Sequence, residues 1–269
     1  FHSIAAFNNS GFDILGNLTN LIPYQNNVLL NLTTCFLIIF GGLGFLVILD
    51  ILRNRRFKKL SLHSKVVIVT TISLLTVGTL LLKGTEDISW MGAFFHSVSA
   101  RTAGFSTYPI GEFTNAGLFV LIVLMFIGAS PGSTGGGIKT STFFVMINAT
   151  KSAATNQHCT AFYRKIGAET ILKAFIITFL SLVTGCLGTL ILCLLGPEYS
   201  LVQVLFEVTS AYGTVGLSTG ITPDLSSASK ILLVLIMFIG RLGAMTIASM
   251  WSFKQPKTAV FTEENITIG

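Results

Sequence analysis

Three short glycine-bearing segments hold the residues with the clearest capacity for chemistry. They read Asn-Ser-Gly-Phe at residues 9–12, Thr-Ala-Gly-Phe at 102–105 and Thr-Val-Gly-Leu at 214–217, and we call them the signature loops. Non-helical backbone at membrane depth is tolerated only where it is buried in protein or lines a watery cavity. Such backbone presents successive carbonyl oxygens, which can replace the hydration shell of a small cation. Glycine adopts angles that other residues resist, so these carbonyls can face one axis.

A short apolar helix is expected before each signature loop and points to the same chemistry. Because the negative C-terminal end of each helix would face the loop, the arrangement favours a cation over an anion. The candidate ion-binding residues are Asn9, Ser10, Gly11, Phe12, Thr102, Ala103, Gly104, Phe105, Thr214, Val215, Gly216 and Leu217.

The composition is that of a membrane protein. Of the 269 residues, 51% are hydrophobic and only 10% are charged, with a mean hydropathy of +0.76. A soluble domain carries about a quarter charged residues, so an ordinary soluble enzyme, a disordered chain and a collagen-like chain are excluded. The net charge of +6 does not indicate a nucleic-acid partner, because the basic residues cluster beside apolar runs. The four cysteines form no CxxC pair and are predicted to be reduced and structural.

Five apolar runs are long enough to cross a bilayer, which requires roughly 20 residues. They cover residues 27–49, 66–82, 116–150, 174–197 and 231–253. The third run is too long for one helix and is interrupted by a proline and a glycine cluster. We therefore predict an all-α polytopic membrane protein.

Three further apolar stretches are too short to span a membrane and are predicted to be re-entrant half-helices. They cover residues 1–7, 90–100 and 201–212. Each one directly precedes a signature loop. The unit that emerges is an outer helix, a half-helix, a signature loop and an inner helix.

The basic residues predict the orientation. They gather in residues 50–65, 151–173 and 254–269, whereas Lys83 and Lys230 lie on the other side. The positive-inside rule places the first group in the cytoplasm. The half-helices then enter from outside, where six acids either concentrate cations at a mouth or merely solvate loops: Asp13, Glu86, Asp87, Glu112, Glu198 and Asp224.

An internal repeat supports this architecture. Residues 1–6, Phe-His-Ser-Ile-Ala-Ala, match residues 95–100, Phe-His-Ser-Val-Ser-Ala, and residues 206–211 form a weaker third copy. Each copy ends a half-helix and is followed by a signature loop. Three copies at equivalent places in the topology indicate a repeated structural unit.

With its three signature loops, the sequence resembles the Trk/Ktr/HKT superfamily of potassium transporters, and in particular their membrane pore subunits. Members resemble four potassium-channel subunits fused in one chain, each with an outer helix, a pore helix and an inner helix around a central pore. The resemblance implies the end of the second repeat at residues 1–60, the third at 61–165 and the fourth at 166–269. Glycine at all three filter positions resembles the potassium-preferring members.

The first repeat of that pattern is absent, together with the outer helix and the start of the pore helix of the second. A closed four-part pore cannot form from these residues alone. The chain is therefore expected to be a fragment, and an inactive gene product is the alternative.

The interruption of the third long run is expected to form a loop within the membrane. Residues 128–142 nearly match a phosphate-binding loop, but Ile138 separates Gly137 from Lys139, and neither a strand nor a βαβ unit precedes it. The structural interpretation is a helix broken at Pro131 and unwound through the glycines. The resemblance implies a gating loop beneath the filter, with a passive kink as the alternative. The candidate gating residues are Gly132, Ser133, Thr134, Gly135, Gly136, Gly137, Lys139 and Arg241.

Two of these residues are cations inside the membrane, where charge is functional by default. Lys139 either repels ions in a closed state or extends toward the aqueous interface. Arg241 lies where the family has an arginine in the last inner helix. Our hypothesis is that it faces the pore, limits cation flux and tethers the gating loop; pairing with Glu207 is the alternative.

Other polar residues near the half-helices are assigned supporting roles. Arg101 closes the second half-helix and could brace the filter against Glu207 or an outer acid. His2 and His96 occupy equivalent positions and are expected to pack or to donate hydrogen bonds, not to bind metal. Trp90 and Tyr108 are expected to anchor the membrane interface.

The function predicted from these features is potassium uptake across the plasma (cell) membrane, through a filter of backbone carbonyls with K+ as the transported ion. An enzyme is not expected, because the spans hold no catalytic constellation. A secondary transporter with sodium coupling is the other alternative, although its inverted repeats would alternate in orientation, whereas these half-helices all enter from one side. No organic cofactor is expected. The resemblance implies a cytoplasmic ring of nucleotide-binding (RCK-type) regulatory subunits and a homodimer in the lipid bilayer.

Overall fold

The computed structural model describes residues 1–16 and 19–243. Residues 244–253 of the predicted fifth span, and the basic segment 254–269 assigned to the cytoplasm, lie outside the described residues. The elements are α1 (His2–Phe7), η1 (Ile22–Tyr24), α2 (Val28–Leu43), α3 (Phe45–Asn54), η2 (Phe57–Lys59), α4 (Leu62–Thr85), α5 (Trp90–Ser99), η3 (Ile110–Glu112), α6 (Asn115–Phe126), α7 (Thr140–Ala154), β1 (Thr160–Ala161), β2 (Arg164–Lys165), α8 (Ala168–Leu195), α9 (Leu201–Gly213), η4 (Thr222–Asp224) and α10 (Ser227–Leu242).

Side-chain caps fix where six of the ten described α-helices begin. The residue before each of six helices accepts a hydrogen bond from a backbone N–H of the first turn, which satisfies one of the donors that a helix start leaves free. At the start of α9 the cap is a complete capping box, in which Ser200 and Gln203 exchange bonds. The capping residues are Asn27, Ser61, Ser89, Thr114, Ser200 and Ser226.

The predicted all-α polytopic membrane fold is confirmed. Within the described residues, α4 and α8 are each long and apolar enough to cross a membrane, and the pair of α2 and α3 passes the same test as one bent span. The described strands, β1 and β2, pair antiparallel in a small hairpin between α7 and α8. Exposed apolar side chains cover much of the helical surface, as a lipid-facing surface requires.

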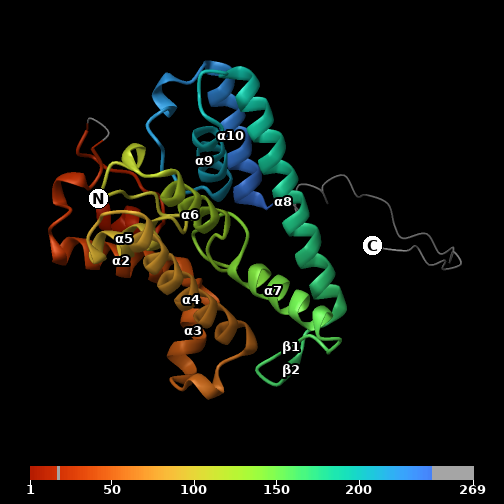
Figure 1. Cartoon of the computed structure of the whole chain (residues 1–269). Helices are drawn as coiled ribbons and strands as arrows, with labels where there is room; N and C mark the ends of the chain where they lie inside the picture. Colours follow the sequence, from red (N-terminus) through yellow and green to blue (C-terminus); the bar gives the residue numbers. More distant parts are fainter. Residues whose placement is uncertain (17–18, 244–269) are drawn as a thin grey trace, which may run out of the picture.

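The short helices are enclosed by the longer ones. Helix α5 packs against α4 and α2, and α9 packs against α8, α10 and α6. Figure 1 shows α8, α9 and α10 side by side, with α2, α4 and α5 in the other half of the molecule. Helix α6 contacts both α4 and α9 and so joins the two halves.

The run at residues 27–49, predicted to be a membrane span, is bent in the structure. The helix breaks at Gly44, whose φ is +83°, and α3 leaves α2 at an angle of 95° before ending at Asn54. A side chain at Gly44 would lie 2.7 Å from the carbonyl oxygen of Pro131. The break therefore depends on a contact with a segment far along the chain.

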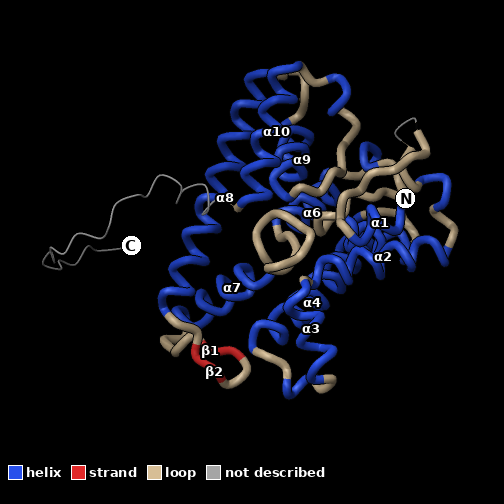
Figure 2. Tube along the Cα trace, turned by 180° about the vertical axis from the view of Figure 1, so that it is seen from behind, coloured by secondary structure: helices blue, strands red, loops and turns tan. Residues whose placement is uncertain are grey.

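The interruption predicted in the run at residues 116–150 is wider than one kink. Helix α6 ends at Phe126 and α7 begins at Thr140, and residues 127–139 form what we call the glycine-rich loop. Its two ends are held together by a parallel bridge between Ile127 and Ile138. Figure 2 shows this loop near the centre of the molecule, between α6 and α7.

Candidate cation pathway

The three signature loops lie against one another although they are far apart in the sequence. A Cβ atom added to Gly11 would overlap the carbonyl oxygen of Ala103 and lie 2.9 Å from the Cα atom of Gly104. A Cβ atom added to Gly104 would overlap the carbonyl oxygen of Val215 and lie 3.3 Å from the Cα atom of Gly216. The first loop thus contacts the second, and the second contacts the third, through backbone alone.

Hydrogen bonds to the half-helices set the direction of the loop carbonyls. In the third loop, Val215 N–H donates to the Ser210 carbonyl at 2.9 Å, and in the second loop Ala103 N–H donates to the Ser99 carbonyl, also at 2.9 Å. In the first loop the Ser10 N–H makes the equivalent bond to Ala5. Because a trans peptide directs its C=O opposite to its N–H, the carbonyl of the residue before each donor points away from its own half-helix.

The backbone of each signature loop follows the same alternating conformation. In all three, the first and third residues have positive φ and the second does not. Positive φ is uncommon for threonine and costs of order 1–3 kcal/mol per residue, so the surrounding packing must enforce it. The residues concerned are Asn9 (51°), Gly11 (65°), Thr102 (78°), Gly104 (82°), Thr214 (52°) and Gly216 (95°).

Serine side chains on the half-helices hold the far end of two loops. Ser99 Oγ donates to the carbonyl of Phe105 at 2.5 Å, and Ser210 Oγ donates to the carbonyl of Leu217 at 2.6 Å. Neither serine is among the site residues predicted from the sequence. Their position one turn before each signature loop was the available signal.

Glu207 is a buried acid whose partners differ from those expected. Its carboxylate accepts hydrogen bonds from Ser218 Oγ at 2.6 Å, from the Thr219 N–H at 3.0 Å and from Thr222 Oγ1 at 2.8 Å. It pairs with neither of the arginines considered for it. Glu207, which is 4% exposed, instead fixes the chain that follows the third signature loop.

The three loops share one open cavity of about 830 Å³, which we call the outer basin. Gly11, Gly104 and Gly216 all line it, and so do the acids Asp13 and Glu112. Of the other acids considered for the mouth, Glu86 accepts hydrogen bonds from the N–H and the hydroxyl of Thr114. Glu86 therefore stabilises the start of α6 through Thr114. Asp13 and Glu112 are the two acids that line the basin, where a cation would collect.

The glycine-rich loop packs against the side of the signature loops. A Cβ atom on Gly135 would overlap Thr102 Oγ1, and one on Gly136 would overlap Thr214 Oγ1. Thr134 Oγ1 donates to the carbonyl of Phe7, which ends α1. One small-residue segment thus touches all three units at once, and larger side chains at these glycines would displace it.

Charged side chains bond to carbonyls of the glycine-rich loop. The Arg241 guanidinium donates to the Thr134 carbonyl, Lys139 Nζ donates to the Gly135 carbonyl at 2.6 Å, and the Arg101 guanidinium donates to the Gly128 carbonyl at 3.2 Å. Arg101, which is 7% exposed, therefore braces this loop and not an acid. Lys139 folds back onto its own loop.

Two histidines pack among aromatic rings. The His96 ring, which is fully buried, lies 5.4 Å from the ring of Phe113, and the His2 ring lies 6.3 Å from that of Phe105. In the part of the chain that the structure describes, no three His, Cys, Asp or Glu side chains form a group that could hold a metal. Tyr108 contacts Ser89 at the start of α5, and Trp90 is exposed.

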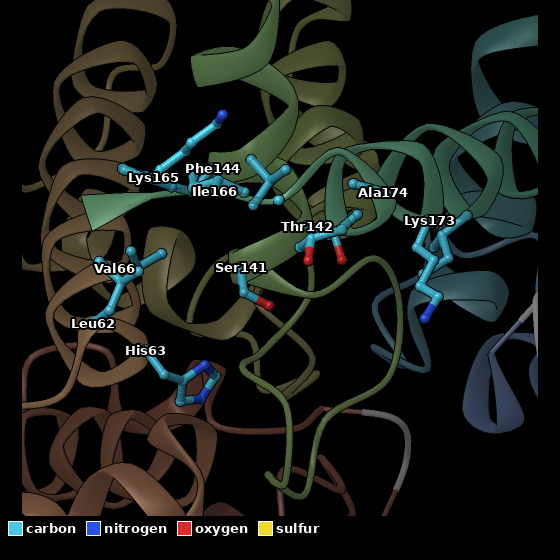
Figure 3. A pocket seen from close by; sticks show the side chains of 14 residues that line it. Leu62, His63, Val66, Ser141, Thr142, Phe144, Lys165, Ile166, Lys173 and Ala174 are labelled. Carbon is cyan, nitrogen blue, oxygen red and sulfur yellow. The ribbon is translucent and has the colours of Figure 1, made fainter. Parts of the chain in front are cut away.

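A separate cavity of about 550 Å³ lies between the N-terminal ends of α4, α7 and α8. Figure 3 shows His63, Ser141, Thr142 and the aliphatic parts of Lys165 and Lys173 around it. Its lining contains two lysines and no acid, so its chemistry does not suit a bound cation. The outer basin is the better candidate for ion entry.

The fold and the site together define a helical membrane protein in which three short helices, each followed by a glycine-bearing loop, gather around one basin lined by two acids. Comparisons with known proteins agree. Residues 1–76 and 54–262 match the family model TrkH, described as a cation transport protein. The chain belongs to this family, which consists of transporters and not of enzymes.

Individual relatives are similar along the whole chain. It is 38% identical to Ktr system potassium uptake protein B of Vibrio alginolyticus, over 100% of this chain and 62% of that protein. It is 36% identical to potassium/sodium uptake protein NtpJ of Enterococcus hirae, over 100% of this chain and 63% of that protein. The crystal structure of the potassium transporter TrkH from Vibrio parahaemolyticus has the same fold, with a TM-score of 0.76 and 18% identity over 93% of this chain and 57% of that one. The chain thus spans about 62% of the length of the Vibrio alginolyticus protein.

Proposed function

We propose that this chain supplies three of the units that line the ion pathway of a potassium-uptake protein in the plasma membrane. The observation that carries the proposal is the convergence of Gly11, Gly104 and Gly216 on one acidic basin. Hydrogen bonds hold the N–H groups of the loops toward the half-helices, so their carbonyls are free to replace the water of a cation. Relatives named for potassium uptake support K+ as the ion.

The same contacts support residues 1–60, 61–165 and 166–269 as successive repeats. Each contains a half-helix followed by a signature loop, and all three loops line the same basin. Half-helices that enter from one side favour a channel-like pathway over the inverted repeats of a secondary transporter. Sodium is the second candidate ion, and the name of the Enterococcus hirae relative, a potassium/sodium uptake protein, favours it.

Gating by the glycine-rich loop is part of the proposal. The loop packs against the side chains of Thr102 and Thr214 and bonds to the Phe7 carbonyl, and these contacts support a role in closing the route from the signature loops. In this closed arrangement, Arg241 tethers the loop through the Thr134 carbonyl. Opening requires that bond to break or to move with the loop.

The partners proposed for the whole protein are a second copy in the membrane and a cytoplasmic ring of RCK-type nucleotide-binding regulatory subunits. The word "system" in the name of the Vibrio alginolyticus relative supports a multi-component assembly. Residues 50–65 and 151–173 form the cytoplasmic face in this proposal, and their basic side chains are where an acidic regulator would dock.

Rescue of a potassium-uptake-deficient cell by the full-length protein tests the proposal. We expect the wild type to restore growth at low K+, and Gly216→Ser to lower the preference for K+ over Na+ by about tenfold, which corresponds to ~1.4 kcal/mol. Gly220→Ser is the matched control, because Gly220 also has positive φ (101°) and lines the basin but lies outside the signature loop. Equal ion preference in wild type and Gly216→Ser would reject this filter assignment.

A further inference from the structure

A cavity of about 400 Å³ lies between α6, α7, α8 and α9 and shares no lining residue with the outer basin. Its lining is aliphatic and aromatic apart from three hydroxyl groups, one sulfhydryl and a glycine. It contains no charged side chain among the residues that line it. The character of these few polar groups decides what can occupy the space.

All three hydroxyl groups already have partners within the protein. Thr178 Oγ1 donates to the Ala174 carbonyl at 2.9 Å, and Thr209 Oγ1 donates to the Leu205 carbonyl at 2.7 Å. The Tyr212 hydroxyl bonds to Ser181 Oγ at 2.5 Å. Because a buried water needs two to four polar partners, this cavity is unsuited to water or ions and suits an apolar occupant.

The cavity opens on the lipid-facing surface of the protein. Leu182 on α8 and Val123 on α6 line it and are 50% and 44% exposed. On α8 the exposed face continues beyond the cavity through Phe179 and Leu190. Residues 178–186 are the central turns of this 28-residue helix, which at about 1.5 Å per residue outreaches a hydrocarbon core of about 30 Å. At that depth the bilayer offers only acyl chains.

The inner wall of the cavity is formed by the two ends of the glycine-rich loop. Ile127 and Ile138, which form the parallel bridge that closes the loop, both line the cavity. The Gly128 N–H donates to the Ile138 carbonyl at 2.8 Å, immediately behind this wall. An occupant therefore packs against the bridge on which the closed shape of the loop depends.

We propose that this cavity binds a phospholipid acyl chain from the surrounding bilayer and that the bound chain stabilises the closed ends of the glycine-rich loop. Continuity with the lipid-facing surface of α8, the apolar lining and the satisfied hydroxyls identify the occupant. The binding step is independent of the proposed function, whereas the effect on the loop rests on it.

The binding step is tested on the full-length protein in phosphatidylcholine vesicles that contain a phospholipid with a diazirine in the middle of its acyl chain. After photolysis, we expect mass spectrometry to find adducts on Met146, which lines the cavity from α7. We expect Gly185→Leu to abolish these adducts and to leave those on Leu190 outside the cavity. No atom lies within 4 Å of a Cβ atom at Gly185, so the leucine side chain starts in open space.

Gly84→Leu is the matched control, because Gly84 is also a helical glycine with no atom within 4 Å of an added Cβ and lies on α4. Three results would overturn the binding step: adducts at Met146 that persist in Gly185→Leu, equal loss in both variants, or adducts confined to outward residues such as Leu190. The last result would also be obtained if a second copy of the chain covered the cavity.

The effect on the loop is tested by cation uptake into vesicles of short-chain and long-chain phosphatidylcholine. Uptake by the wild type and by Gly84→Leu is expected to change several-fold between the two lipids, and uptake by Gly185→Leu is expected not to change. A lipid response that Gly185→Leu retains would overturn the coupling. If no variant transports a cation while the Met146 adducts behave as expected, the proposed function fails and the acyl-chain site stands.

Discussion

At Gly104 the absence of a side chain is what allows two signature loops to meet. The glycine has a φ of +82° and lies against both the Val215 carbonyl and the backbone of Gly216. A β-carbon would be disfavoured twice, by the backbone conformation and by overlap with the neighbouring carbonyl. The requirement for glycine therefore comes from loop-to-loop contact as well as from the backbone angle.

Gly104→Ala is expected to lower cation uptake by about tenfold or more, equivalent to ~1.4 kcal/mol on the barrier, because the two loops must move apart. The measurement is the initial rate of uptake by the full-length protein at matched expression. Gly16→Ala is the control, since Gly16 also has positive φ (79°) but no atom lies within 4 Å of its added Cβ. Equal rates in the two variants would contradict the contact.

Arg241 makes a charged hydrogen bond that a neutral side chain cannot replace. Arg241→Ala is expected to raise the rate of cation uptake several-fold, because bonds to charged groups are stronger than neutral ones and the glycine-rich loop loses one. Lys230→Ala is a matched control on the same helix, since Lys230 Nζ donates to the Pro223 carbonyl at 2.8 Å, away from the loop. Unaltered potassium kinetics in a well-expressed Arg241→Ala protein would refute the tether.

At the scale of elements, the glycine-rich loop supplies hydrogen-bond partners to the backbone groups at the break between α2 and α3. Ser130 Oγ donates to the carbonyls of Gly42 and Leu43, which end α2, and the Phe45 N–H at the start of α3 donates to the Gly132 carbonyl. Helix ends leave such groups without partners inside the helix. A movement of the loop therefore also removes the partners that stabilise the 95° bend.

Gly136→Ala is expected to prevent the glycine-rich loop from packing against Thr214, because the added carbon would lie 3.0 Å from Thr214 Cγ2 and closer still to its hydroxyl. We expect a higher basal cation leak, several-fold above wild type, in vesicles without any regulatory partner. Gly167→Ala, at a glycine with open space around it, should leave the leak unchanged. A Gly136→Ala protein with wild-type leak would show that this loop is not the barrier.

The sequence predicted the elements whose cause is local. Apolar runs and the internal repeat were enough to place the half-helices α5 and α9 and the signature loops. The break at Gly44 was not predicted: the run at residues 27–49 contains no proline or charge, and its glycines at 41, 42 and 44 permit a kink without fixing its place or angle, which depend on Pro131 and Ser130. Low helix propensity at these glycines allows the bend, and tertiary contacts select Gly44 as its position.

At the scale of the whole molecule, all three signature loops line one basin, which is the arrangement expected of repeated units with the same orientation. Repeats that enter a membrane from the same side place equivalent loops at the same depth, so the sequence could predict that these loops meet. It could not predict the partners of Glu207 or Arg101, because several donors and acceptors were compatible with each. In the structure, Glu207 accepts hydrogen bonds from the hydroxyl groups of Ser218 and Thr222, and Arg101 donates to the Gly128 carbonyl.

The most direct test of the account is the position of a heavy potassium analogue in crystals of the full-length protein soaked with Tl+. The account predicts anomalous density between the signature loops, within coordination distance of the carbonyl oxygens of residues such as Ala103 and Val215, and its loss after soaking with excess K+. Thallium found only at the carboxylates of Asp13 and Glu112, with none among the loop carbonyls, would contradict the central claim that backbone oxygens bind the ion.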